Sequence, residues 1–320
     1  MTPENDKMIK ITLIGCGYWG SRVLKAILRT PGLELAAVCD KDPKQLEQLR
    51  LTYADSLFYA DDYQQLLKDP SIDAVALTVP AGAHFKLAEQ ALAAGKHVFI
   101  EKPFTETLAQ AERLYELAKE KERRIHVDHI MVYHPAVRKM KELLEENCLG
   151  ELRYMEMRRS SFGGARSDVS VLQDLGVHDI SIIDYLTDGE EPAAVCSLGE
   201  KLGFPHPSIA FTLLKYKGFS ASLTASWVSP AKERKIILGG TDKTLVFDEI
   251  SSPDKLMVYD NKDPNDLNIV QLEEGNALDN SLAHFCAGVE SGTGSLTDAA
   301  SAVRIIKILT EAKAGVTCNL

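Results

Sequence analysis

The sequence has no long apolar run, no excess of positive charge and no closely spaced cysteine pair. Its 320 residues include 36 lysines and arginines against 46 aspartates and glutamates, a formal net charge of -10. Nucleic acids and anionic membranes bind to a concentrated positive face, so we expect neither as a partner. Without a secretory signal or an apolar stretch that spans a bilayer, we expect no membrane segment. The six scattered cysteines suit reduced thiols in a cytoplasmic protein.

The rest of the composition is that of an ordinary globular protein, 45% hydrophobic and 26% charged. The chain is too long for most single hydrophobic cores, and a prior of about 150 residues per domain predicts two domains. Any anionic ligand of such an acidic protein must be held by local basic residues.

The chain is organised around residues 9–20, where an apolar run ends at Ile14 and a helical pattern begins at Ser21. The glycines between them have the G-x-G-x-x-G spacing of a dinucleotide-binding turn. The first permits a tight turn, the second lets a pyrophosphate approach, and the third lets helix and strand pack closely. These glycines are Gly15, Gly17 and Gly20. Tyr18 and Trp19, inside the turn, could cover the cofactor phosphates or simply pack.

A carboxylate stands where the cofactor ribose is expected. The second strand, 33–39, is followed by Asp40, twenty residues beyond Gly20. Its carboxylate can accept both ribose hydroxyls and would repel a 2′-phosphate, so it favours NAD over NADP. Lys41 could soften that preference, and Asp40 could instead cap the helix before Pro43.

Strand and helix patterns alternate up to residue 127 without a hairpin signal, which predicts a doubly wound parallel sheet. Further strands are expected at 72–79, 97–100 and 125–127, and helices at 43–51, 85–94 and 105–121. Ligands bind such sheets at the carboxyl ends of the strands. The residues that follow those ends include Asp40, Pro80, Glu101 and Lys102.

Beyond residue 126 the pattern changes to an α+β domain with a largely antiparallel, open sheet. A helix at 135–147 precedes strand-like segments at 151–161, 193–199, 207–216, 219–228, 234–239 and 244–248, and helices at 278–290 and 297–313 close the chain. We therefore expect a Rossmann domain over 1–125 and a second domain over 126–320. Helices on one face leave the other sheet face to be covered, so we expect a homo-oligomer, either a dimer or a tetramer.

Two motifs resemble the Gfo/Idh/MocA oxidoreductase family. The first is Glu101-Lys102-Pro103 with the approach to it over 91–100, and the second is the D-x-G-x-H element of Asp174–His178. Members often carry glycines just before this element, whereas this chain has Val-Ser-Val-Leu-Gln at 169–173, which leaves the shape of that loop open. The resemblance implies a Rossmann domain followed by a sheet domain with substrate residues and oligomer contacts.

The family chemistry needs a base, because oxidation of a secondary alcohol by NAD removes a hydride from carbon and a proton from the hydroxyl. Lys102 and His178 are the candidates, and Asp174 can hold a substrate hydroxyl or stabilise the imidazolium. By spacing alone, Lys102 could pair with Glu101 on the surface, and the other two could be structural; the resemblance favours the catalytic roles. It also implies a cis bond before Pro103 that aims the lysine.

The remaining histidines have weaker assignments. The resemblance places His84 near the nicotinamide ribose, although it could equally begin a helix. His126, Asp128, His129 and His134 match no compact ligand spacing together with Asp174 and His178, so we expect no metal site.

Three arginines carry the substrate signal. Arg158, Arg159 and Arg166 could grip a diphosphate or carboxylate, or they could alternate on a solvated strand and pair with Glu151 or Glu156. The run 158–182 resembles the branch of the family that oxidises the sugar 3-hydroxyl of UDP-N-acetylglucosamine or its uronate. The alternatives are a dehydrogenase of inositol or another free sugar and a non-catalytic NAD-binding regulator.

Overall fold

The computed structural model describes residues 8–163, 169–263 and 265–313. The chain divides into two compact units. The first consists of Met1–Ile130 with Asn276–Val303, and the second of Met131–Gly275 with Arg304–Leu320.

The first unit is built on a six-stranded sheet in which every strand runs parallel to its neighbours. The spatial order is β3-β2-β1-β4-β5-β6. The strands are β1 (Ile9–Ile14), β2 (Leu33–Cys39), β3 (Tyr59–Ala60), β4 (Ala74–Leu77), β5 (His97–Ile100) and β6 (Ile125–Val127). This order confirms the doubly wound fold, and its switch point lies between β1 and β4, where ligands bind such sheets.

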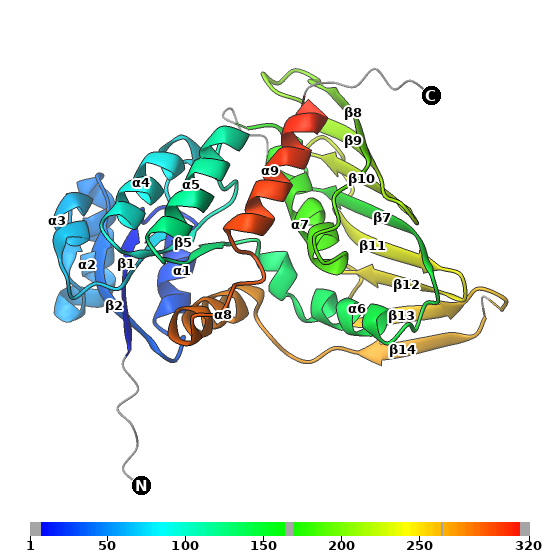
Figure 1. Ribbon diagram of the computed structural model, residues 1–320, viewed down its shortest axis with the longest axis horizontal. Coiled ribbons are helices and arrows are strands. Elements are labelled where there is room, and N and C mark those ends of the chain that lie inside the picture. The colour runs from blue at the N-terminus through cyan, green and yellow to red at the C-terminus, as the bar shows by residue number, and fades with distance from the viewer. Residues whose placement is uncertain (1–7, 164–168, 264, 314–320) are drawn as a thin grey trace, which may run out of the picture. The chain divides into compact units, whose positions relative to one another are not determined.

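The helices of the first unit are α1 (Gly20–Ile27), α2 (Pro43–Tyr53), α3 (Tyr63–Lys68), α4 (Ala81–Ala93), α5 (Leu108–Glu120) and α8 (Ala277–Ser291). Figure 1 shows α4 and α5 beside each other, apart from α1 and α8. Helix α8 belongs here because Leu282 and Phe285 lie in one core cluster with Val23 of α1 and strand residues such as Phe99. The expected division into 1–125 and 126–320 therefore does not describe residues 276–303, whose apolar face completes the core of the first unit.

The second unit contains an eight-stranded sheet, ordered β14-β13-β12-β11-β7-β10-β9-β8. All neighbours are antiparallel except β7 and β10. The strands are β7 (Leu152–Ser160), β8 (Ala194–Glu200), β9 (Ile209–Lys215), β10 (Ser220–Ser226), β11 (Glu233–Gly240), β12 (Lys243–Asp248), β13 (Ser252–Asp260) and β14 (Leu267–Gln271). The largely antiparallel sheet is confirmed, but β13 and β14 were not predicted.

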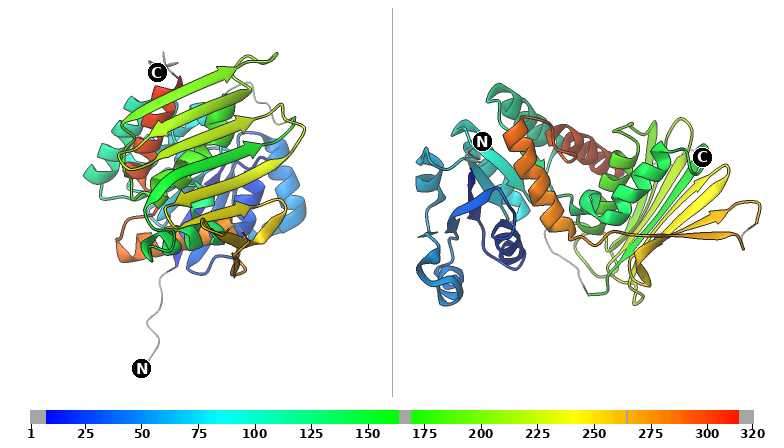
Figure 2. Two further views of the ribbon diagram at one scale, coloured as in Figure 1. Left: turned by 90° about the vertical axis from the view of Figure 1, so that its right-hand side faces the viewer. Right: turned by 90° about the horizontal axis from the view of Figure 1, so that it is seen from below.

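One face of this sheet is covered by helices α6 (Pro135–Glu145) and α7 (Val177–Leu186), as Figures 1 and 2 show. Strand β9 alternates accordingly: Ala210, Thr212 and Leu214 are buried, whereas Phe211 and Leu213 are exposed. Pleating places successive side chains on opposite faces, so the exposed residues mark the face without helices.

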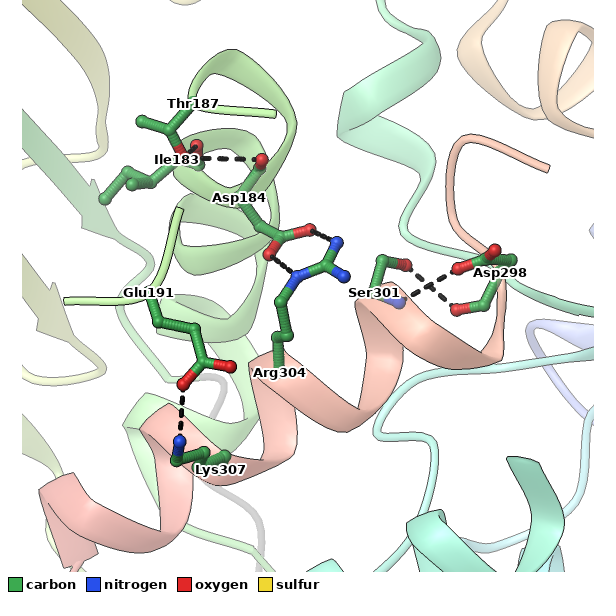
Figure 3. A network of polar contacts seen from close by, with 8 residues as sticks. All are labelled: Ile183, Asp184, Thr187, Glu191, Asp298, Ser301, Arg304 and Lys307. Carbon is green, nitrogen blue, oxygen red and sulfur yellow. Dashed lines mark hydrogen bonds and ion pairs between the residues drawn. The ribbon is translucent and has the colours of Figure 1, made fainter. Parts of the chain in front are cut away.

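Helix α9 (Ala299–Lys313) is tied to α7 by a two-pronged ion pair, drawn in Figure 3. The Arg304 guanidinium donates from Nε to Asp184 Oδ1 at 2.7 Å and from Nη2 to Oδ2 at 2.9 Å. Lys307, one turn further along α9, pairs with Glu191 at the surface. Planar two-point geometry fixes orientation as well as distance, so Arg304 sets how this part of α9 lies on α7.

The thiols of Cys16, Cys39, Cys148 and Cys286 are free. Cys196 is disulfide-bonded, so the expectation of reduced thiols does not hold at that position. No helix among the described residues is long and apolar enough to cross a bilayer.

Candidate active site

The close packing around the glycine-rich turn after β1 leaves no room for a side chain at two of its glycines. A Cβ on Gly15 would come within 2.7 Å of the Thr78 carbonyl oxygen, and Gly15 has a φ of +95°. A Cβ on Gly20 would come within 2.1 Å of the Gly15 oxygen. By contrast, a Cβ on Gly17 would meet no heavy atom within 4 Å. Gly15 and Gly20 therefore allow the turn itself, and Gly17 borders open space.

Asp40 joins the end of β2 to this turn. Its Oδ2 accepts the Cys16 N–H at 2.6 Å, and its Oδ1 accepts the Asp42 N–H at 2.9 Å. The alternative that Asp40 caps the next helix is wrong, because Asp42 is the N-cap of α2 and accepts the Lys44 N–H at 3.0 Å. A carboxylate oxygen has more than one acceptor site, so Asp40 can hold the turn and still accept a ribose hydroxyl.

The two aromatic residues of the turn have different environments. Tyr18 is 78% exposed, and the Arg22 guanidinium stacks 3.9 Å from its ring centre and donates to its hydroxyl at 2.7 Å. Trp19 packs against the core cluster of the first unit. Its buried Nε1 has no hydrogen-bond partner among the described residues. Trp19 therefore packs in the core, which was one of the two alternatives for these residues. Tyr18 is exposed at the turn.

Lys102 follows β5, on the same edge of the sheet as the glycine turn and Asp40. Its peptide bond to Pro103 is cis, as the resemblance implied. Its backbone N–H donates to Oε2 of Glu101, a buried residue, at 3.2 Å. The alternative of a surface pair does not describe Glu101, because its carboxyl group is buried inside the unit.

His84 links two loops at this edge. Helix α4 begins at Ala81, earlier than expected, so His84 lies in its first turn. The buried ring approaches the Pro103 carbonyl oxygen with Nδ1 at 2.8 Å and the Val79 carbonyl oxygen with Nε2 at 2.9 Å. Carbonyl oxygens only accept, so a neutral ring can donate to one of them and a protonated ring to both. Pro80 is the exposed N-cap residue of α4.

His129 lies just beyond β6, and the sequence analysis named it only in the set of residues that matches no metal-ligand spacing. It is 1% exposed, and neither ring nitrogen has a hydrogen-bond partner in the described chain. Burial, with a smaller effect from the positive charge of Lys102, lowers the pKa of His129 to about 3. Within the described ranges no three His, Cys, Asp or Glu side chains are grouped to hold a metal ion.

In the second unit, Asp174 and His178 lie one turn apart at the start of the α7 segment. Residues Leu172–Gly176 form a π-helix that continues into α7. Gly176 suits this wide turn because it has no Cβ. A Cβ at this position would lie only 2.5 Å from Leu172 Cδ1. The indole Nε1 of the buried Trp227 donates to Asp174 Oδ2 at 3.2 Å. Sequence reasoning missed Trp227, because nothing local connects it with Asp174; its only signal is that it is one of two tryptophans.

Arg158 and Arg159 do not lie on one face. Arg158 and Arg159 are neighbours on β7 and point to opposite faces of the sheet. Arg158 is exposed and pairs with Glu156 at 3.1 Å, whereas Arg159 is buried and pairs with Asp179 of α7 at 2.8 Å. Burial raises the pKa of Asp179 despite that ion pair. Arg166 lies outside the described residues. The alternative of a strand arginine paired with Glu156 therefore describes Arg158, and Arg158 is on the face away from α7.

Two family models match the chain in sequence order. Residues 9–129 match the oxidoreductase family with an NAD-binding Rossmann fold, and residues 137–246 match the GFO/IDH/MocA C-terminal domain. The chain belongs to the GFO/IDH/MocA oxidoreductase family.

Two relatives and one solved structure place this member within the family. The chain is 38% identical over 158 residues to the uncharacterized oxidoreductase YdgJ of Escherichia coli, which covers 48% of this chain and 44% of YdgJ. It is 32% identical over 207 residues to UDP-N-acetylglucosamine 3-dehydrogenase of Acidithiobacillus ferrooxidans, which covers 63% of each. These alignments span about half to three fifths of the relatives' own lengths. The solved structure of the latter enzyme matches with a TM-score of 0.85 at 25% identity, over 96% of this chain and 98% of that one.

Proposed function

We propose that this GFO/IDH/MocA protein is an NAD-dependent dehydrogenase that oxidises a secondary hydroxyl, at C3, of a nucleotide sugar such as UDP-N-acetylglucosamine or its uronate. The observation that carries the proposal is that Lys102 follows β5 on the sheet edge that also holds the glycine turn and Asp40. The similarity to UDP-N-acetylglucosamine 3-dehydrogenase supports the choice of substrate.

The cofactor-binding residues proposed here fit a dinucleotide. Open space at Gly17 accommodates the pyrophosphate beside the start of α1, where backbone N–H groups and the helix dipole favour an anion. Asp40 accepts the adenosine ribose hydroxyls and disfavours a 2′-phosphate, so we propose NAD over NADP. When bound, the nicotinamide accepts the hydride.

The proton chemistry falls to Lys102 or His178, either of which can take the hydroxyl proton as the hydride leaves. Asp174 holds a sugar hydroxyl or the imidazolium in this proposal. Its hydrogen bond from Trp227 keeps one carboxylate oxygen in a defined position. A fixed acceptor matters because catalytic groups must be held within hydrogen-bond reach of the reacting hydroxyl.

A second candidate function, dehydrogenation of inositol or another free sugar, is favoured by the arginines. Arg158 lies on the sheet face away from α7, and Arg159 is occupied by Asp179. Of the arginines proposed to bind a diphosphate, this leaves Arg166 for the nucleotide-sugar proposal. Arg166 lies outside the described residues.

A substrate panel decides between the two. Purified protein with NAD is offered UDP-N-acetylglucosamine, its uronate, other nucleotide sugars and free polyols, and formation of the reduced cofactor is followed by its absorbance. The first proposal expects turnover only with nucleotide sugars, and Arg166→Ala should raise KM with little change in kcat. Turnover of inositol without any nucleotide-sugar activity would replace the first proposal by the second.

We also propose that the protein forms a homo-oligomer through the bare face of the eight-stranded sheet. Leu198 pairs with Phe211 across β8 and β9, and both are exposed, by 64% and 49%. Leu213 on the same face is 56% exposed. Apolar side chains in register on an uncovered sheet face suit a second copy of the chain. We also propose a cytoplasmic location, which the free thiols of Cys16, Cys39, Cys148 and Cys286 support.

A further inference from the structure

Two carboxyl groups meet inside the first unit at the ends of neighbouring strands. Glu101 follows β5 and Asp128 follows β6, and these strands are parallel with Ile100 opposite Val127. Glu101 is 8% exposed and Asp128 is 1% exposed. The two carboxyl groups are near enough for Asp128 to raise the pKa of Glu101.

The hydrogen bonds around this pair leave one buried oxygen of each group without a donor. Glu101 Oε2 accepts the Lys102 N–H at 3.2 Å, and Asp128 Oδ1 accepts the Ser281 hydroxyl at 2.7 Å. The remaining oxygens, Glu101 Oε1 and Asp128 Oδ2, are buried and have no donor among the described residues. Two ionised carboxylates only accept, so they cannot bond to each other. A shared proton satisfies both oxygens at once.

Electrostatics agrees with that reading. Burial, and then the neighbouring Asp128 carboxyl, raises the pKa of Glu101 well above its ordinary value. Burial also raises the pKa of Asp128. The positive charge of Lys102 acts on both carboxyl groups in the opposite direction. One negative charge on the pair, balanced by Lys102, is therefore favoured over two.

A chain of hydrogen bonds leads from Asp128 toward the surface. Ser281 of α8 is 2.9 Å from His126 Nε2, and His126 Nδ1 is 2.8 Å from the hydroxyl of Ser295, which is partly exposed. The His126 ring is stacked on Phe99, with 5.0 Å between ring centres, and meets Phe285 edge-on. These rings hold the imidazole in the plane that keeps both contacts.

The hydroxyl and imidazole groups of this chain can donate their hydrogen bonds either toward Asp128 or toward the surface. With Asp128 ionised, Ser295, His126 and Ser281 can each donate to the next group inward. With the proton on Asp128, each can donate outward, because hydroxyls and both imidazole nitrogens change roles. Each proton of the chain moves by one step between the two arrangements, and the net result is the transfer of one proton between Asp128 and the surface.

We propose that Glu101 and Asp128 hold one proton between them and exchange it with the surface through Ser281, His126 and Ser295. This rests on the proposed function, in which oxidation of R₂CHOH by NAD yields R₂C=O, the reduced cofactor and one proton. Lys102 lies next to the pair, which therefore stores or returns that proton in either direction of the reaction. These five are positioning residues, since they act through Lys102 and do not contact the sugar in this proposal.

An infrared measurement tests the shared proton without any substrate. The full-length protein at neutral pH should show a protonated-carboxyl C=O band that shifts in D₂O and is lost in Asp128→Asn. An asparagine amide donates to Glu101 and accepts from Ser281, so this variant keeps the shape of the pair while removing its need for a proton. Glu101→Gln should remove the same band. A spectrum without that band, or a band that both variants retain, would overturn the shared proton.

Turnover tests the path. Ser281→Ala and Ser295→Ala should keep the infrared band and NAD affinity but lower kcat roughly tenfold or more, with a larger solvent isotope effect. Ser301→Ala is the control, because Ser301 is a buried serine of the same unit whose hydroxyl donates to the Asp298 backbone oxygen and to no other group among the described contacts. If the two path variants matched this control in kcat and isotope effect, the path would be refuted. A wild-type protein that oxidises no sugar would instead refute the proposed function, and the infrared band would still decide the shared proton.

Discussion

At the scale of single residues, the free-energy cost of burying a histidine depends on whether its ring nitrogens have hydrogen-bond partners. His129 and His97 both have a lowered pKa, to about 3 and about 4, and burial is the main cause in each. His97 accepts the Arg124 N–H through Nδ1 at 3.0 Å, whereas the ring nitrogens of His129 have no partner in the described structure. A buried polar group without a partner lowers the free energy of unfolding, so we expect His129 to destabilise the fold.

His129→Leu should therefore not lower the free energy of unfolding at neutral pH, whereas His97→Leu should lower it by about 1 kcal/mol or more. Below the ordinary histidine pKa of about 6.5, the unfolded chain gains a proton that native His129 does not bind. Between about pH 6.5 and about pH 3, wild-type protein thus loses the part of its unfolding free energy that depends on neutral His129. The unfolding free energy of His129→Leu relative to wild type should therefore rise by roughly 1 kcal/mol per pH unit as the pH falls. Urea unfolding at several pH values measures this, and an advantage that does not change with pH would contradict it.

Asp40 is the residue that we expect to set cofactor preference. Asp40→Asn removes the charge that repels a 2′-phosphate while an amide oxygen can still accept the Cys16 N–H. The ratio of NADP to NAD dissociation constants should fall roughly tenfold, about 1.4 kcal/mol. Asp42→Asn, which changes the next carboxylate but keeps the cap of α2, should leave the ratio unchanged. Titration of both cofactors checks this, and tighter NADP binding by the wild type would rule out the assigned preference.

At the scale of elements, local patterns predicted most strands of the parallel sheet and the residues at their ends. Asp40 and Lys102 were found because parallel strands place their carboxyl ends on one edge. The faces of Arg158 and Arg159 could not be found, because they depend on the register of β7 against β10 and β11. Likewise, no residue of β14 is buried, and even its apolar Leu267 and Ile269 are exposed, so the strand lacks the alternation that predicts a half-buried strand.

The π-helix before α7 depends on one glycine. In Gly176→Ala the new methyl group would overlap Leu172, so we expect a loss of about 1–3 kcal/mol in unfolding free energy. Gly218→Ala is the matched control, because its Cβ would meet no heavy atom within 4 Å. Chemical denaturation of both variants is the measurement. Equal stability of the two would mean that Leu172 moves aside and that Gly176 does not fix the turn that presents Asp174.

At the scale of the whole molecule, the units are not simply successive stretches of chain. Helix α8 returns to the first unit from beyond the second sheet, and its apolar side chains join the core around β1 and α1. Sequence periodicity predicted this helix but gave no information on which core it completes. Its return also brings Ser281 to Asp128, 153 residues away in the chain.

The bare sheet face of the second unit is where assembly can be tested. Leu213→Glu places a charge in the middle of the exposed apolar residues and should convert the oligomer into a smaller species. Leu51→Glu is the control, since Leu51 is 85% exposed on α2 in the first unit. Light scattering at micromolar concentration gives the masses. A wild-type protein with the mass of a monomer would exclude the proposed homo-oligomer.

The most direct test of the central claim, that Lys102 is part of the site of hydride and proton transfer, is the turnover of Lys102→Ala with the sugar identified by the panel. Loss of a positioned proton-transfer group lowers kcat by about 10²- to 10⁴-fold, while NAD affinity should change little. Lys119→Ala, at an exposed lysine of α5, should match the wild type. Near-normal kcat in Lys102→Ala would contradict the account and move the chemistry away from the end of β5.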